Sequence, residues 1–307
     1  MLVNSKDLYL DAIKNHYAIG AFNFVNMEVL QGILETAVEL NSPIIIQCST
    51  GAIKYAGEDY LKGMVLNTTK NLNIPVIWNL DHGKTFEDCV NAINLGFTNV
   101  MIDASSLPYE ENIALTRKVV EYAHKHNVTV EAELGVLAGV EDDVKSDVHL
   151  YTDPNQAIDF INKTGCDSLA IAIGTSHGIY KFKGEAKLRL DILDELSKKL
   201  PNYPFVLHGA SSIPQDYVTK ANEFGATLQN AKGVPEEMLK IACEKNVCKV
   251  NVDSDLRIGF TAGIREYLAN NTSDVDMRNY LKNGKKYVKE LVAFKIEHVF
   301  NSKNKVK

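Results

Sequence analysis

The sequence predicts an α/β protein with the (β/α)₈ architecture of a TIM barrel, extended by extra C-terminal helices. Eight short apolar segments rich in valine and isoleucine recur along the 307 residues, and amphipathic helical segments separate them. The apolar segments are continuous rather than alternating, as expected of parallel strands that are covered on both faces. Eight strands close such a sheet into a barrel, and the chain length lies within the usual range of this fold.

The strands and helices follow one another from end to end of the chain. The predicted strands are residues 18–22, 43–47, 76–80, 99–102, 129–132, 168–173, 205–207 and 248–250. The clearest helices between them are residues 27–40, 86–95, 110–126 and 191–200. An open doubly wound sheet is the alternative, but it usually carries a glycine-rich fingerprint after its first strand, and residues 20–23 do not match one.

No linker divides the chain, so residues 1–307 are expected to form a single domain. The residues after about Ser273 are expected to be added helices that pack on the barrel or on another subunit. The connection from Leu134 to Asp153 is too long for a simple turn, and it is polar, acidic and interrupted by two glycines. Connections of this length in a compact domain are usually functional, which favours a lid over the site.

Composition narrows the class of protein. The 45% hydrophobic and 23% charged content is that of an ordinary globular protein, and the net charge of −6 argues against a nucleic-acid or membrane surface. No apolar run approaches the roughly 20 residues that span a bilayer, and the first residues lack the apolar core of a signal peptide. Five scattered cysteines are typical of a reducing compartment, so a soluble cytoplasmic protein is expected.

Three of the eight histidines share one setting. His82, His177 and His208 each lie at or soon after the end of a predicted strand, and each is followed by glycine. The C-terminal ends of barrel strands open onto one face, so three imidazoles that are distant in sequence can converge there. One such histidine alone could equally be a polar residue that caps a strand. Three together predict a catalytic zinc site, in which three imidazoles leave one coordination position open.

Carboxylates lie at other strand ends. Asp81 precedes His82, Asp103 ends the fourth predicted strand, and Glu133 follows the fifth. A charged residue at the end of a buried strand is costly unless it is paired or ligating. Asp103 and Glu133 are therefore interpreted as orienting the histidines, as holding a second ion, or as forming structural ion pairs. Asp81 lies beside a predicted ligand and is the better candidate for acid–base chemistry.

The last two strands end in small and hydroxyl-bearing residues. The segments are residues 208–212, which include Gly209 and Ser211, and residues 251–254, which include Asp253 and Ser254. Backbone N–H groups at the start of a helix bind anions, and barrels frequently hold phosphate at the loops after strands 7 and 8. Each segment alone is equally typical of a helix cap. Together with Gly178 and the metal site, they predict a phosphate pocket.

These motifs, in this order, resemble those of the class II, zinc-dependent fructose-1,6-bisphosphate aldolases. The resemblance extends from about Leu2 to Phe300. It is carried by residues 20–24, 80–83, 100–105, 131–135, 173–178, 207–211 and 249–257. It implies a lyase of glycolysis and gluconeogenesis that cleaves fructose 1,6-bisphosphate reversibly to dihydroxyacetone phosphate and glyceraldehyde 3-phosphate.

The resemblance also implies roles for individual residues. His82, His177 and His208 would be the zinc ligands, with Asp103 and Glu133 near an alternative metal position. Asp81 would exchange a proton with the C4 hydroxyl, and Glu141, in the acidic connection, would move the proton at C3 of dihydroxyacetone phosphate. Implied contacts with substrate are Asn23, Ser49, Gly178, Gly209, Ser211, Asn251, Asp253, Ser254 and Arg257.

Further implications concern partners. Arg257 would reach the C6 phosphate from a neighbouring subunit, which implies a homodimer or homotetramer. Main-chain oxygens around the phosphate loops would also hold a monovalent cation, Na⁺ or K⁺.

The sequence departs from many relatives at Ala138, where glycine is frequent, and at Ser254, which replaces a frequent threonine and keeps the hydroxyl.

Three other functions stay open. A tagatose-1,6-bisphosphate aldolase would use the same zinc site on a substrate that differs at one carbon. A metal-dependent hydrolase of the amidohydrolase type would place a His-x-His pair at the end of the first strand, where this chain has Phe22-Asn23-Phe24. A former aldolase that serves only as a binding protein is disfavoured, because all the predicted ligands and both acid–base carboxylates are present.

Overall fold

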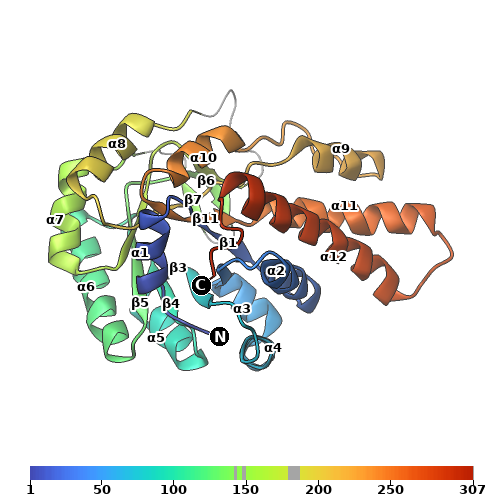
Figure 1. Cartoon of the computed structure of the whole chain (residues 1–307), viewed down its shortest axis with the longest axis horizontal. Coiled ribbons are helices and arrows are strands. Elements are labelled where there is room, and N and C mark those ends of the chain that lie inside the picture. The colour runs from blue at the N-terminus through green and yellow to red at the C-terminus, as the bar shows by residue number, and fades with distance from the viewer. Residues whose placement is uncertain (142–143, 147–149, 179–186, 307) are drawn as a thin grey trace.

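Eight parallel strands close into the predicted barrel (Figure 1). The computed structural model describes residues 1–141, 144–146, 150–178 and 187–306. Around the barrel the order is β1-β11-β10-β8-β5-β4-β3-β2. The strands are β1 (Ile19–Asn23), β2 (Ile44–Ser49), β3 (Val76–Gly83), β4 (Asn99–Ile102), β5 (Thr129–Leu134), β8 (Ser168–Ile171), β10 (Phe205–Leu207) and β11 (Val247–Val252).

Helices surround the barrel, and local sequence signals fix the ends of some of them, such as α5. The Thr85 hydroxyl and the Asp88 side chain form a capping box at the start of α5, and left-handed Gly96 ends that helix, so its predicted bounds are confirmed. The helices are α1 (Lys6–Lys14), α2 (Met27–Glu39), α3 (Thr50–Ala56), α4 (Glu58–Thr69), α5 (Phe86–Leu95), α6 (Tyr109–Lys125), α7 (Pro154–Thr164), α8 (Leu190–Lys199), α9 (Gln215–Glu223), α10 (Glu236–Cys243), α11 (Ser254–Asn270), α12 (Met277–Phe294) and the π-helix η1 (Lys295–Val299).

Several strands run further toward the carboxyl end than an apolar pattern predicts. β2, β3, β5 and β11 continue through polar residues, so that Ser49, Asp81, Glu133 and Asn251 lie within strands instead of after them. The strand ladders pair these ends directly, as Ser49 with Asp81 shows. Polar residues can continue a buried strand here because their side chains contact one another at the mouth of the barrel.

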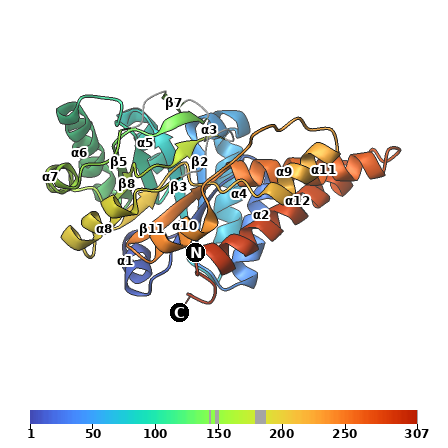
Figure 2. The same cartoon turned by 90° about the horizontal axis from the view of Figure 1, so that it is seen from above.

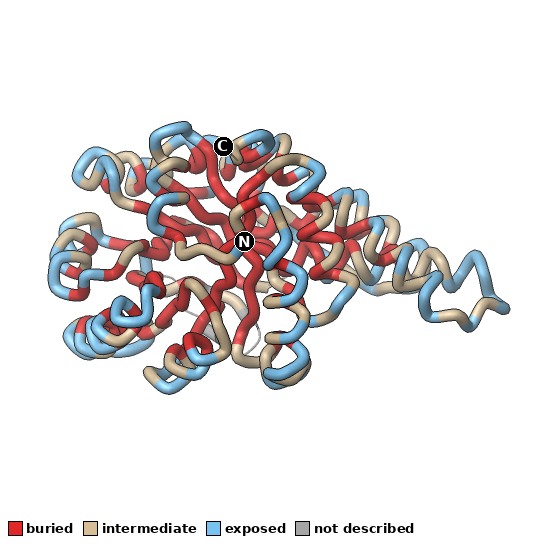
Figure 3. The backbone as a smooth tube through the Cα atoms, turned by 60° about the horizontal axis from the view of Figure 1, so that its bottom comes forward, coloured by how far each residue is buried: buried red, intermediate tan, exposed pale blue. Residues whose placement is uncertain are grey.

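The N-terminal end of the barrel is closed by apolar packing. Tyr9 and Ala12 of α1 and the nearby Tyr17 are buried against Ile45 and Ile77 inside the barrel. A second apolar layer lies between the strands and the surrounding helices. Figure 3 shows the result as a continuous buried centre with exposed helical turns around it. This packing fills the N-terminal end of the barrel, opposite the carboxyl ends of the strands.

The added C-terminal helix forms a long hairpin with the last barrel helix. α11 begins directly after β11, and α12 returns along it and packs on α11 and α2. The hairpin projects from the barrel (Figure 2), and its tip at residues 271–276 is largely exposed (Figure 3). None of the helices in the described part of the chain is long and apolar enough to cross a membrane.

The predicted lid segment contains regular structure that its polar sequence did not indicate. β6 (Ala138–Glu141) and β7 (Val144–Ser146) pair antiparallel, and β6 also pairs parallel with β9 (Ser176–His177). The segment therefore forms part of a small three-stranded sheet beside the barrel. Asp142, Asp143 and His149 lie outside the described residues.

Candidate active site

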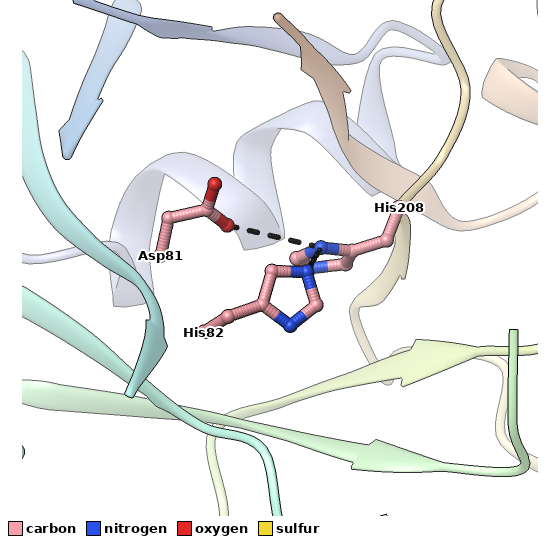
Figure 4. Close-up of side chains that lie close together, drawn as sticks. All are labelled: Asp81, His82 and His208. Carbon is pink, nitrogen blue, oxygen red and sulfur yellow. Dashed lines mark hydrogen bonds and ion pairs between the residues drawn. The ribbon is translucent and has the colours of Figure 1, made fainter. Parts of the chain in front are cut away.

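Two of the predicted metal ligands face each other at the carboxyl end of the barrel. His82 comes from the end of β3 and His208 directly follows β10. The Nε2 atom of His82 and the Nδ1 atom of His208 are 2.9 Å apart, and Asp81 Oδ1 lies 3.8 Å from the same Nδ1 atom (Figure 4). One ligand atom from each of these three buried residues lies within 4.8 Å of the others.

The backbone at His82 is irregular, and this explains why adjacent residues share the site. In a regular strand, neighbouring side chains point to opposite faces. His82 instead has a φ of 49°, in the left-handed region, and the pairing of β3 with β4 shifts between Leu80 and Gly83. Asp81 and His82 can therefore both lie at the mouth of the barrel (Figure 4).

The donor set fits a divalent metal. Zinc binds imidazole nitrogens at about 2.0–2.1 Å in tetrahedral geometry, which separates two such nitrogens by about 3.3 Å. The observed 2.9 Å between His82 and His208 is close to that separation. Both rings are buried, and the surrounding carboxylates supply negative charge. These two histidines can hold one cation between them with little rearrangement.

His177 lies beside this pair without completing it. Its ring centroid is 5.0 Å from that of His82 and 6.4 Å from that of His208. Among the described residues, the sets whose ligand atoms lie within 4.8 Å of one another do not include it. His177 is buried and is the last residue of the two-residue strand β9.

Two glycines hold the backbone of His177 in place. Gly139 of β6 pairs with His177 at a φ of 114°, and a Cβ atom there would lie 2.4 Å from the His177 carbonyl oxygen. Gly209, at a φ of 58°, would place a Cβ atom 2.6 Å from the Ser176 carbonyl carbon. Only glycine permits this approach at these backbone angles. The lid sheet and the loop after β10 thus fix the segment that carries His177.

Asp103 and Glu133 surround the far side of His82. Asp103 Oδ2 accepts a hydrogen bond from His82 Nδ1 at 3.0 Å, and Glu133 Oε2 lies 3.9 Å from that nitrogen. Burial disfavours the imidazolium, but the Asp103 hydrogen bond and the nearby carboxylates outweigh it and raise the pKa of His82 to about 10. Burial, followed by the charge of Asp103, raises the pKa of Glu133 well above its usual value. Asp103 and Glu133 together attract positive charge, and they can orient His82 or hold a second ion.

Sequence reasoning missed the residues that orient His208. Its Nε2 atom donates to Glu131 Oε1 at 2.6 Å, and Glu131 Oε2 pairs with Lys249 Nζ at 2.7 Å. Glu131 and Lys249 are fully buried inside the barrel, and their opposite charges compensate each other there. The Lys249 charge and the His208 bond hold the pKa of Glu131 down, to about 2, against the effect of burial. With Nε2 protonated, His208 presents Nδ1 as an acceptor.

Removing the acceptor for His208 is expected to weaken metal binding. The paired substitutions Glu131→Met and Lys249→Met eliminate the acceptor and remove both charges of the buried pair. Loss of such a hydrogen bond typically costs about 10- to 100-fold in metal affinity. The matched control, Glu131→Gln with Lys249→Met, keeps an acceptor oxygen and should bind metal like the unmodified protein. Competition with a chelator measures both affinities, and equal values would contradict the orienting role.

Asp81 is held by two amides. Asn23 Nδ2 donates to Asp81 Oδ2 at 2.8 Å, and Asn251 Nδ2 donates to Oδ1 at 3.1 Å. Asn251 also lies 3.0 Å from His208 Nδ1, so it contacts both the carboxylate and the predicted ligand. Two predicted substrate-contacting residues are therefore brought to the reacting end of the site, where they fix the orientation of Asp81.

A chain of side-chain amide hydrogen bonds across adjacent strands ends at Asn23 and fixes its orientation. Gln47 donates to Asn23 at 2.7 Å, Asn79 to Gln47 at 3.0 Å, and Asn99 to Asn79 at 2.6 Å. These residues occupy register positions on adjacent strands β1 to β4. Each donor points in the same direction along the chain of amides, which strengthens every bond in it. The sequence pattern that could have predicted this chain is one amide residue in each of four consecutive strands. The pattern predicts contacts only once the strand register is known.

The loops after β10 and β11, for which the sequence predicts a phosphate pocket, contact each other. Asp253 N donates to Ser211 Oγ at 3.3 Å, and both residues are buried. Buried Ser254 begins α11, and Gly178 has a φ of 84°. These hydroxyls and backbone N–H groups at a helix start can bind an anion.

Three other predicted residues lie at the edge of this arrangement. Arg257 Nε bonds to Asp253 of the same chain at 2.9 Å, and about half of its side chain is exposed. Ser49 is buried at the start of α3, where its hydroxyl accepts a hydrogen bond from Ala52 N at 3.1 Å. Glu141 is the last residue of β6, and its side chain lies outside the described part of the structure.

Comparison with known proteins supplies independent information. Residues 3–305 match the family model described as fructose-bisphosphate aldolase class-II. The chain is 47% identical to the fructose-bisphosphate aldolase of Treponema pallidum, over 98% of this chain and 96% of the relative. It is 46% identical to that of Giardia intestinalis, over 94% and 89%. The crystal structure of the YdjI aldolase from Escherichia coli K12 matches all of both chains at 31% identity with a TM-score of 0.82.

Proposed function

The chain belongs to the class II fructose-bisphosphate aldolase family, and we propose that it cleaves fructose 1,6-bisphosphate reversibly to dihydroxyacetone phosphate and glyceraldehyde 3-phosphate. The observation that carries the proposal is a buried carboxylate, Asp81, beside two facing imidazoles, His82 and His208. Residues 1–307 would act as a single catalytic domain. Such an enzyme would serve glycolysis or gluconeogenesis in the cytoplasm.

The family depends on a divalent metal, and Zn²⁺ is the ion proposed here. His82, His177 and His208 would bind it, and Asp103 and Glu133 would hold an alternative or second position. Zn²⁺ bound there would supply Lewis-acid stabilisation of the negative charge that develops when the C3–C4 bond breaks. Schiff-base chemistry needs a neutral lysine amine, and Lys249, a lysine buried inside the described barrel, is paired with Glu131.

Two carboxylates would move the protons. Asp81, oriented by Asn23 and Asn251, would remove the C4 hydroxyl proton as glyceraldehyde 3-phosphate leaves. Glu141 would then deliver a proton to C3 of dihydroxyacetone phosphate. Its place in β6, which pairs with the strand that carries His177, supports this role. Closure of the lid would withdraw Glu141 from water.

The phosphate groups would fix the substrate. Gly178, Gly209, Ser211, Asp253 and Ser254 would bind the C1 phosphate. Asn251 would lie near the reacting carbons, and Asn23 and Ser49 would contact the substrate. A monovalent cation, Na⁺ or K⁺, would bind main-chain oxygens beside the phosphate.

A second copy of the chain would complete the site. Arg257 would reach the C6 phosphate of a neighbouring subunit, in a homodimer or homotetramer. The half-exposed position of this guanidinium supports the proposal. Its salt bridge to Asp253 would then exchange for one to phosphate, which accepts two parallel hydrogen bonds from arginine.

The direct test compares two sugar bisphosphates. Zinc-loaded protein should release triose phosphates from fructose 1,6-bisphosphate, detected with coupling enzymes, and should act more slowly on tagatose 1,6-bisphosphate. Faster turnover of the tagatose compound would assign the alternative substrate. Absence of cleavage of either compound by folded, metal-loaded protein would overturn the aldolase proposal.

A further inference from the structure

A buried lysine lies at the junction of the C-terminal hairpin and the phosphate end of the site. Lys295 is the first residue of η1, directly after α12, and its side chain is 1% exposed. Burial of an ammonium group is costly unless opposite charges surround it. Neither metal chemistry nor proton transfer in the proposed reaction uses this group. Its position therefore calls for another explanation.

Lys295 contacts the loop after β10, residues 209–213, and two carboxylates beside it. Its Nζ atom lies 3.1 Å from Asp255 Oδ2 and 3.0 Å from Glu236 Oε1, and it donates to the Ser212 hydroxyl. Asp255 is fully buried. The ammonium group thus joins η1 to α10, to α11 and to the loop itself.

Asp255 holds the backbone of the same loop. Its Oδ1 atom accepts a hydrogen bond from Ile213 N at 2.7 Å, and its Oδ2 atom accepts one from Ser212 N at 3.2 Å. Ile213 has a φ of 52°, which a β-branched residue rarely adopts. Such a conformation persists only where its surroundings impose it. The Asp255 carboxylate imposes it here, and Lys295 compensates the charge of that carboxylate.

We propose that Lys295 is a positioning residue for the phosphate-binding loop, acting through Asp255. The inference rests on the proposed function, in which Gly209 and Ser211 of this loop bind the C1 phosphate. Without the lysine, the Asp255 carboxylate is left uncompensated beside the loop that is proposed to receive a phosphate dianion. The loop then loses both its shape and part of its attraction for anions. Lys295 also links the phosphate end of the site to α12 and hence to the projecting hairpin.

The test measures phosphate binding directly. Inorganic phosphate is titrated calorimetrically into metal-loaded protein that carries Lys295→Met, and KM and kcat for fructose 1,6-bisphosphate are measured beside it. We expect a loss of about tenfold in phosphate affinity and a similar rise in KM, since small misplacements of binding groups carry large costs. Metal content should stay unchanged. Lys295→Arg, which keeps the charge, should recover much of the affinity.

Controls separate positioning from general stability. Lys289→Met removes another ammonium group of α12 that pairs with Glu35 and Glu39, away from the loop, and should leave phosphate affinity unchanged. Asp255→Asn combined with Lys295→Met removes both buried charges, so it serves if the single variant does not fold. This double variant should likewise bind phosphate more weakly than the unmodified protein, because the loop loses its bonds to Lys295 and the charge of Asp255.

Two results would overturn the proposal. One is unchanged phosphate affinity in folded Lys295→Met protein, and the other is an equal loss in Lys289→Met protein. Phosphate binding needs no carbon–carbon chemistry. Wild-type protein that binds phosphate but cleaves no sugar would therefore overturn the proposed function. The effect of Lys295→Met on phosphate affinity would still decide whether Lys295 positions the loop.

Discussion

EDTA treatment is expected to abolish triose phosphate release, and Zn²⁺ is expected to restore it. Breaking the C3–C4 bond leaves an electron pair on C3 that needs an electrophile. Lys249, a buried lysine of the described barrel, is paired with Glu131 and so is not free to form a Schiff base. Lewis-acid stabilisation contributes several kcal/mol to such a step, so the loss should be on the order of 10³-fold or more. The coupled assay with and without Zn²⁺ measures it.

Metal analysis of the same samples decides how the result is interpreted. Activity that persists in protein shown to be metal-free would make the assignment of His82, His177 and His208 wrong. His208→Ala should lower both metal content and activity, because its Nδ1 atom faces His82 at 2.9 Å. His298→Ala, at an exposed histidine of η1, is the matched control and should change neither.

The barrel could be predicted from the sequence because a parallel strand buried on both faces leaves a continuous apolar pattern. The same pattern located His82 and His208, since both lie where an apolar run ends. A helix such as α5 was predicted to the residue because Thr85 and Gly96 fix its ends through local hydrogen bonds and a left-handed turn. These features depend on neighbours in the chain, which a sequence displays directly.

Other parts of the site depend on register and could not be predicted. Glu131 and Lys249 lie within strands, and nothing local shows that β5 and β11 bring them together inside the barrel. The amides Gln47 and Asn79 acquire a function only when the pairing of β2 with β3 is known. The lid sheet escaped prediction because its polar residues lack the apolar alternation of a strand, although Gly139 permits the close pairing that forms it.

Replacing Asp81 with asparagine is expected to reduce kcat by about 10²- to 10⁴-fold, the usual contribution of a positioned acid–base group. Asparagine keeps the size of the side chain, and its single amide oxygen can still accept a hydrogen bond from Asn23 or Asn251. It cannot accept the C4 hydroxyl proton, because a neutral amide is not a base. Metal content should therefore stay near that of the unmodified protein, and steady-state kinetics with metal analysis measure both quantities.

Proton exchange separates this role from that of Glu141. Dihydroxyacetone phosphate exchanges its C3 proton with deuterated water by a step that involves no C4 hydroxyl group. Asp81→Asn protein should retain that exchange while losing cleavage. Glu141→Gln protein should lose exchange as well, because it lacks the carboxylate that is proposed to move the C3 proton. Loss of exchange in metal-loaded Asp81→Asn protein would show instead that Asp81 serves substrate binding or the C3 proton, and a kcat within a few-fold of the unmodified enzyme would remove Asp81 from the chemistry altogether.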